Sequence, residues 1–158
     1  LEFRRGVVEH QRDPRIAPDL TPAQREALEQ PRPGGARLRF MRPEVPLGAV
    51  HELQAAGAEI LAGSDAPNPG TVHGATLHQE LELLVQAGLT PVQALAAATS
   101  VPARRFRLAD RGAIAPGRRA DQVLVDGDPT TDVAATRAIA GIWRNGAPVE
   151  RRRYADAN

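Results

Sequence analysis

The chain has 158 residues, of which 42% are hydrophobic and 25% charged, and this composition is typical of one globular domain of ordinary size. The net charge of +1 gives no reason to expect nucleic acid or an anionic membrane as a partner, and no apolar run approaches the ~18 residues of a transmembrane helix. The absence of cysteine excludes disulfides, thiolate metal sites and cysteine nucleophiles.

Residues 1–45 are predicted to be an irregular N-terminal segment with one short helix. Residues 1–20 carry charges and prolines without a clear period, so we expect them to be irregular or loosely attached. The tetrapeptide Thr21-Pro22-Ala23-Gln24 begins a helix, because Thr supplies an N-cap oxygen, Pro fits the first helical position and Gln can return the capping-box bond. This helix is expected to end before Pro31.

In residues 46–110, sequence patterns typical of helices and of a strand follow one another, as is typical of an α/β unit. Apolar residues recur at helical spacing, and glycines follow the first two helices as candidate C-terminal residues. A second Thr-Pro-x-Gln motif begins at Thr90. The expected elements are helices at 46–56, 75–87 and 91–99, a short helix from Pro102 to about 106–108, and a buried strand at 58–63.

The run Gly63-Ser64-Asp65-Ala66-Pro67 follows directly on this predicted strand, and His73 comes eight residues after Asp65. In parallel α/β folds the loops at the C-terminal ends of strands hold the chemistry. The carboxylate could therefore serve a hydrolytic or metal site, or it could simply cap loop amides. His73 could face the same cleft, or its ring could bond a loop carbonyl near the start of the next helix.

Residues 111–150 are predicted to form a small β portion. Glycine and proline pairs separate short β-type runs, and the strands are expected at 122–125 and 139–144. Asn145-Gly146 predicts a type I′ hairpin turn that leads into a further short strand. The polar tail, residues 151–158, is expected to fray.

From about Leu47 to Arg152 the sequence resembles the C-terminal part of the metal-dependent amidohydrolase superfamily, in the imidazolonepropionase-like and prolidase-like branch. The blocks that carry this resemblance follow one another in the family's order. They are Ala62-Gly63-Ser64-Asp65-Ala66, His73-Gly74, Glu80-Leu81-Glu82-Leu83-Leu84, Ala87-Gly88-Leu89-Thr90-Pro91, Ala94-Leu95, Ala98-Thr99, the block from Gly112 to Asp121, Asp126-Gly127-Asp128-Pro129 and Trp143-Arg144-Asn145-Gly146.

The resemblance implies an α/β fold: the C-terminal part of a (β/α)₈ TIM-type barrel plus strands of a small flanking β domain. It implies an enzyme that cleaves a small-molecule amide-type bond by metal-activated water. Because the sequence shows neither a signal segment nor a transmembrane segment, we expect the protein to be cytoplasmic. Asp65 would be a metal ligand and the general base, and His73 would contact substrate or hold Asp65 in place. The divalent metal is expected to be zinc.

The chain departs from the family's pattern by lacking the His-x-His pair of the first strand and the remaining ligands. By resemblance it is then a C-terminal fragment with one metal-site residue, inactive alone, because a catalytic metal commonly has three protein ligands. Self-association or pairing with the missing barrel half would cover its open edge.

The alternative function is a non-catalytic structural or interaction module that reuses this framework. Glu80 and Glu82 are interpreted as solvated helix residues, and His51 and His78 as residues on helix flanks. His10 stands in a segment without a readable pattern.

Overall fold

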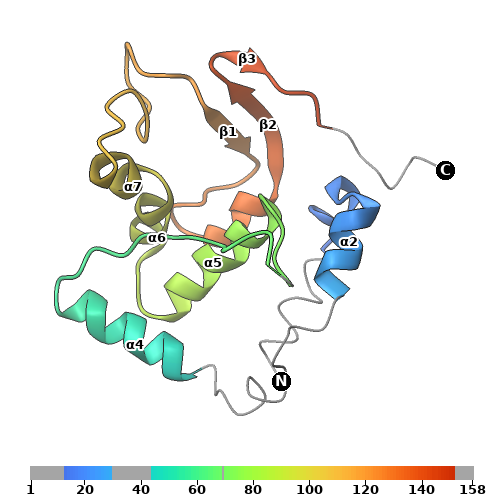
Figure 1. The fold of residues 1–158 in the computed structure, drawn as a ribbon. Coiled ribbons are helices and arrows are strands. Elements are labelled where there is room, and N and C mark those ends of the chain that lie inside the picture. Colours follow the sequence, from blue (N-terminus) through green and yellow to red (C-terminus); the bar gives the residue numbers. More distant parts are fainter. Residues whose placement is uncertain (1–12, 30–43, 69, 152–158) are drawn as a thin grey trace.

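The computed structural model describes residues 13–29, 44–68 and 70–151, so His10 and most of the polar tail lie outside the described residues. The described part combines packed helices with one small sheet, which confirms the α/β class in its coarse form (Figure 1). In chain order the elements are η1 (Ala17–Asp19), α2 (Pro22–Glu29), α4 (Glu44–Ala55), α5 (Ala75–Gln86), α6 (Pro91–Ala98), α7 (Ser100–Arg105), β1 (Gln122–Val125), η2 (Val133–Arg137), β2 (Ile139–Arg144) and β3 (Ala147–Pro148).

Helices α2 and α6 begin at the two predicted capping boxes. The Gln24 backbone N–H donates to Thr21 Oγ1 at 3.2 Å, and the Thr21 N–H donates to Gln24 Oε1 at 2.9 Å. The same reciprocal pair joins Thr90 and Gln93, at 3.2 and 2.8 Å. Each box satisfies two backbone donors that a helix start would otherwise leave unpaired, which is why a four-residue motif suffices to fix these boundaries.

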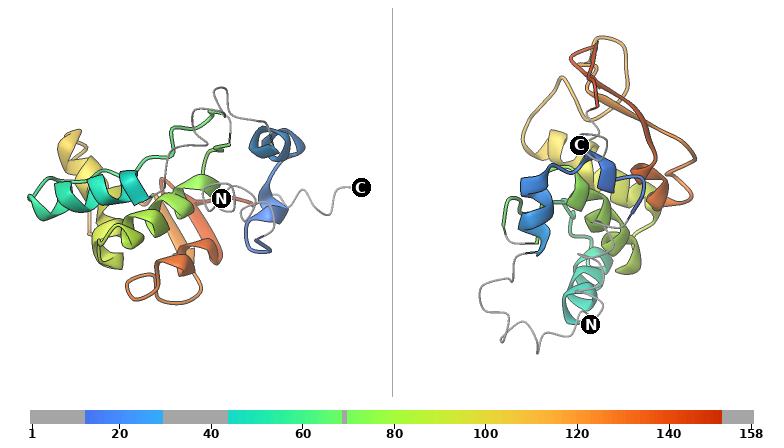
Figure 2. Two further views of the ribbon diagram at one scale, coloured as in Figure 1. Left: turned by 90° about the horizontal axis from the view of Figure 1, so that it is seen from below. Right: turned by 90° about the vertical axis from the view of Figure 1, so that its right-hand side faces the viewer.

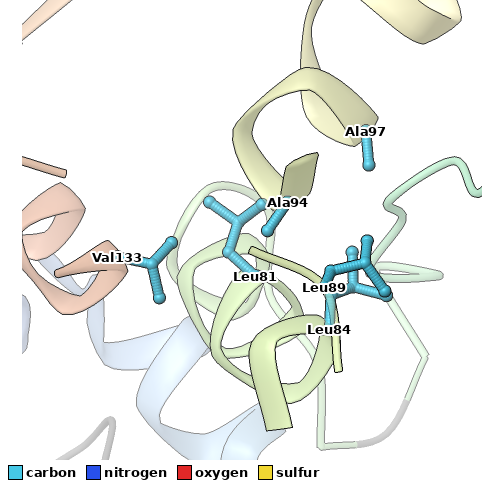
Figure 3. Packing of buried hydrophobic residues seen from close by; sticks show 6 residues of the cluster. All are labelled: Leu81, Leu84, Leu89, Ala94, Ala97 and Val133. Carbon is cyan, nitrogen blue, oxygen red and sulfur yellow. The ribbon is translucent and has the colours of Figure 1, made fainter. Parts of the chain in front are cut away.

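Helix α5 is the central element, in contact with α4, α6 and η2 (Figure 1). Its apolar stripe faces a cluster of buried side chains that come from α5, the turn after it, α6 and η2 (Figure 3). Burying each large apolar side chain of this kind contributes about 1.5–3 kcal/mol. The members are Leu81, Leu84, Leu89, Ala94, Ala97 and Val133.

The N-terminal segment is packed against the rest of the chain, so the expectation that residues 1–20 are loosely attached was wrong for the described residues 13–20. A second buried cluster joins Ile16, Leu20 and Leu28 to Val72 and Ala75. Figure 2 shows α2 at the end of α5 opposite to α4. The i, i+4 spacing of Ile16 and Leu20 is a local signal, but their partner Val72 lies more than 50 positions later in the sequence.

The small sheet has the antiparallel order β1-β2-β3. The turn between β2 and β3 has Asn145 at φ 52° and Gly146 at φ 79°, the left-handed pair that a type I′ hairpin requires. The Trp143 ring lies over Gly141 in β2, where an added Cβ would come within 2.7 Å of the ring. The predicted strands at 122–125 and 139–144 are confirmed.

The predicted strand at 58–63 was wrong. In the described residues this segment has no strand partner, and β1, β2 and β3 pair only with one another. A parallel strand needs a neighbouring strand to receive its backbone hydrogen bonds, and no described segment supplies one. Instead, the Ala62 N–H donates to the Ala97 carbonyl at the end of α6, at 2.9 Å.

None of the described helices combines the length and the apolar character that crossing a bilayer would require.

Candidate functional site

Asp65 lies exposed at the end of the irregular segment 58–65, with a left-handed backbone at φ 50°. Its backbone carbonyl accepts hydrogen bonds from the Asn68 N–H at 3.2 Å and from Asn68 Nδ2 at 2.9 Å. These bonds close a turn that contains the cis peptide bond Ala66–Pro67. Within the described residues the Asp65 carboxylate itself has no hydrogen-bond or ion-pair partner. The side chain is therefore presented outward and does not cap the loop amides.

His73 lies at the other end of the same loop, one residue before the Gly74 N-cap of α5. Its side chain is exposed. No hydrogen bond joins it to Asp65 or to a loop carbonyl in the part of the chain that the structure describes. The loop thus carries one carboxylate and one imidazole on its surface, both accessible to a ligand.

The loop between these two residues is held by the N-terminal segment. The Gly70 N–H donates to the Ala27 carbonyl at 3.2 Å, and Val72 is buried in a cluster with Ile16, Leu20 and Leu28. The sequence analysis missed this support, because contacts between residues so far apart leave no local pattern. The consequence is that α2 fixes the stretch that carries His73.

Glu80 is half-buried on α5. Burial raises the pKa of this carboxyl above its ordinary value, and the nearby Gly63 backbone N–H partly offsets the effect. The interpretation of Glu80 as a solvated helix residue was wrong, since the side chain is half-buried.

Glu82 also departs from the solvated interpretation. It forms a two-point ion pair with Arg137 of η2, with Nε–Oε1 at 2.6 Å and Nη2–Oε2 at 2.9 Å. The Arg137 side chain is only 6% exposed and lies 3.5 Å from the Asp13 carboxylate as well. Paired charges in this geometry tie α5, η2 and the N-terminal segment together.

The two described histidines outside the loop have structural contacts, in line with their interpretation as residues on helix flanks. His51 Nδ1 lies 3.1 Å from the Ala87 carbonyl at the C-terminal end of α5. His78 Nδ1 lies 3.0 Å from Thr136 Oγ1 and connects α5 to η2.

Among the described residues, no three His, Cys, Asp or Glu side chains gather closely enough to hold a metal ion. The partner-free carboxylate of Asp65 fits one oxygen-ligand position. The described residues can thus supply one metal ligand, the Asp65 carboxylate, and do not form a complete metal site by themselves.

Comparison with known proteins identifies the family. The model of the amidohydrolase family matches residues 42–150. An imidazolonepropionase from Deinococcus deserti is 36% identical over 109 residues, which cover 66% of this chain and 27% of the relative. An adenine deaminase from Methanoregula boonei is 51% identical over 57 residues, 36% of this chain and 10% of the relative.

Among solved structures, a Bifidobacterium longum protein assigned as a prolidase matches with a TM-score of 0.61 and 33% identity. The match covers 70% of this chain and 28% of that one. The chain thus spans about a quarter of the length of these imidazolonepropionase and prolidase relatives. This chain belongs to the amidohydrolase family, in the branch that holds imidazolonepropionases and prolidase-like hydrolases.

Proposed function

We propose that this chain forms the C-terminal part of a metal-dependent hydrolase that cleaves an amide-type C–N bond, cyclic or linear, in a small molecule. The observation that carries the proposal is the outward carboxylate of Asp65, which has no protein partner in the described residues and lies inside the family match. An exposed acceptor left free in this way is available to a ligand or a reacting water.

In this proposal Asp65 is a metal ligand and the general base. The divalent metal, which we take to be zinc, supplies an acidified water when bound. The Asp65 carboxylate accepts the proton of the water that attacks the carbonyl carbon, and a carboxylate within hydrogen-bond reach is suited to this transfer. His73, exposed on the same loop, binds the substrate or orients Asp65.

We further propose that the isolated 158-residue chain does not catalyse this reaction. Relatives of the family extend well beyond the matched region, and the remaining ligands would come from parts of a (β/α)₈ barrel that this sequence does not contain. Three apolar side chains of the β portion are more than half exposed: Ile114 at 87%, Val123 at 58% and Leu124 at 55%. Pairing with the rest of the barrel, or self-association, would cover such surface.

The test uses the protein expressed from its complete gene and a panel of imidazolone, N-acyl and dipeptide substrates. We expect turnover that a chelator abolishes and added zinc restores, and that Asp65→Asn lowers by at least about a hundredfold. The control is Asp126→Asn, which removes the same charge from an exposed position in the β portion. The absence of turnover on every substrate, together with no stabilisation by zinc, would favour the non-catalytic module instead.

A further inference from the structure

Residues 70–72 lie between the two candidate site residues in the sequence, and on one side they reach the turn at Asp65. Thr71 Oγ1 lies 2.8 Å from the Asn68 carbonyl oxygen and 3.4 Å from the Asp65 carbonyl oxygen. The Thr71 backbone N–H donates to the same Asn68 carbonyl at 2.9 Å. Because Asn68 itself donates to the Asp65 carbonyl, these contacts fix the turn that presents the carboxylate relative to Thr71.

On the other side, the same stretch leads directly into His73. The Val72 side chain is buried, whereas the side chain of His73 is exposed. The Val72 carbonyl accepts a hydrogen bond from Thr76 Oγ1 at 2.8 Å, in the first turn of α5. Since both the side chain and the carbonyl of Val72 are held, the place at which the chain presents His73 is fixed as well.

Residues 70–72 are held by the N-terminal segment, by which we mean residues 13–29, and this segment lies outside the family match at 42–150. Gly70, which is buried, donates its N–H to the Ala27 carbonyl near the end of α2 at 3.2 Å. In a continuing α-helix this carbonyl would accept from residue 31, but Pro31 has no N–H. The sequence of α2 thus leaves this acceptor to the loop.

The N-terminal segment is itself fastened to the β portion and to η2 by ion pairs. Asp13 accepts hydrogen bonds from Arg15 at 3.0 and 2.8 Å, and its carboxylate lies 3.5 Å from Arg137 of η2. Arg151, which follows the last strand, pairs with Asp19. The segment therefore connects the C-terminal portion of the chain to the loop that carries the candidate site.

We propose that the N-terminal segment positions Asp65 and His73 by holding residues 70–72 between them; the proposal rests on the proposed function of these two residues. The side chains that perform this task are those clustered with Val72, namely Ile16, Leu20 and Leu28. They are positioning residues, which act on the site through Val72. Methionine at position 28 would keep the cluster filled, whereas alanine would leave a cavity beside the loop.

The first test measures hydrogen exchange by mass spectrometry in the complete protein, in peptides that span residues 66–76. Leu28→Ala should speed exchange there by at least about tenfold, and Leu28→Met should leave it close to wild type. The control is Leu84→Ala, which opens a cavity of the same kind in the main core cluster, away from the cluster of Val72. In this control, exchange over 66–76 should stay within about twofold of wild type.

A milder variant covers the case in which Leu28→Ala does not fold. Ile16→Val removes one methylene group from the same cluster, and we expect it to speed exchange over residues 66–76 by about threefold. If exchange there is no faster in Leu28→Ala, or in Ile16→Val where that variant takes its place, than in Leu84→Ala, the positioning role is overturned, whether or not Asp65 is catalytic.

The second test measures hydrolysis by the same variants, at a temperature at which circular dichroism shows all of them folded. Leu28→Ala should lower kcat/KM by about tenfold or more, because displaced reacting groups lose much of their rate, while Leu28→Met and Leu84→Ala should stay within about threefold of wild type. Wild-type kcat/KM in Leu28→Ala, with Asp65→Asn inactive, would also overturn the positioning role. If instead Asp65→Asn and His73→Ala leave turnover unchanged while exchange responds as expected, the proposed function has failed and only the anchoring of the loop stands.

Discussion

Replacing Gly112 by alanine should destabilise the protein far more than the same change at Gly117. Both glycines have left-handed backbones, at φ 84° and 79°, where a side chain costs about 1–2 kcal/mol. They differ in their surroundings. A Cβ at Gly112 would meet Ala103 Cβ at 2.4 Å and the Thr99 carbonyl oxygen at 2.9 Å, whereas nothing lies within 4 Å of a Cβ at Gly117.

The atoms that a Gly112 side chain would strike belong to α7 and to the residue that precedes it, and one of them is backbone, so they cannot turn aside. Overpacking of this kind adds about 1–3 kcal/mol. We therefore expect Gly117→Ala to cost about 1–2 kcal/mol and Gly112→Ala about 2–5 kcal/mol. Urea unfolding followed by circular dichroism, with equal slopes in both variants, gives the two free energies. Equal costs for the two substitutions would refute the close packing of the β portion on α7.

Two further predictions follow from the charged groups. The pKa of Glu80 in the folded protein lies above its ordinary value of 4.5, so the folded state binds this proton more tightly than the unfolded state does. The stabilisation that results is fully present below pH 4.5. It is lost as the pH rises through the folded pKa. In thermal melts, the Tm of Glu80→Gln minus the Tm of the wild type should therefore increase between about pH 4 and pH 7. A Tm difference that stays constant over this range would contradict the burial of this carboxyl. Arg137→Ala should cost about 3–5 kcal/mol in urea unfolding, because it leaves the Glu82 carboxylate without its two-point partner; a cost below about 1 kcal/mol would mean that water replaces the pair.

The features that the sequence predicted correctly are those with local causes. The capping boxes at Thr21 and Thr90 close within four residues, and the Asn145-Gly146 turn needs only its own two backbone conformations. The apolar stripe of α5 is likewise a property of one helix. Such elements can be derived from spacing, because the groups that stabilise them are neighbours in the chain.

The failures share the opposite property. A strand at 58–63 depends on a neighbouring strand, and no strand of the described residues lies beside this segment, since β1, β2 and β3 pair only with one another. The burial of Ile16 depends on Val72, and the burial of Glu80 depends on how α5 meets segments distant in the sequence. Of the candidate site, the sequence predicted Asp65 and His73 on one loop, but not the helix α2 that supports the loop.

The central claim is that Asp65 belongs to a hydrolytic centre that this chain completes only together with the rest of the enzyme. The most direct measurement is hydrolysis of one responsive amide-type substrate by three samples: the complete protein, its Asp65→Asn variant and the purified 158-residue chain. We expect turnover in the first sample alone. Turnover by the 158-residue chain, or full activity in the Asp65→Asn variant, would contradict the claim.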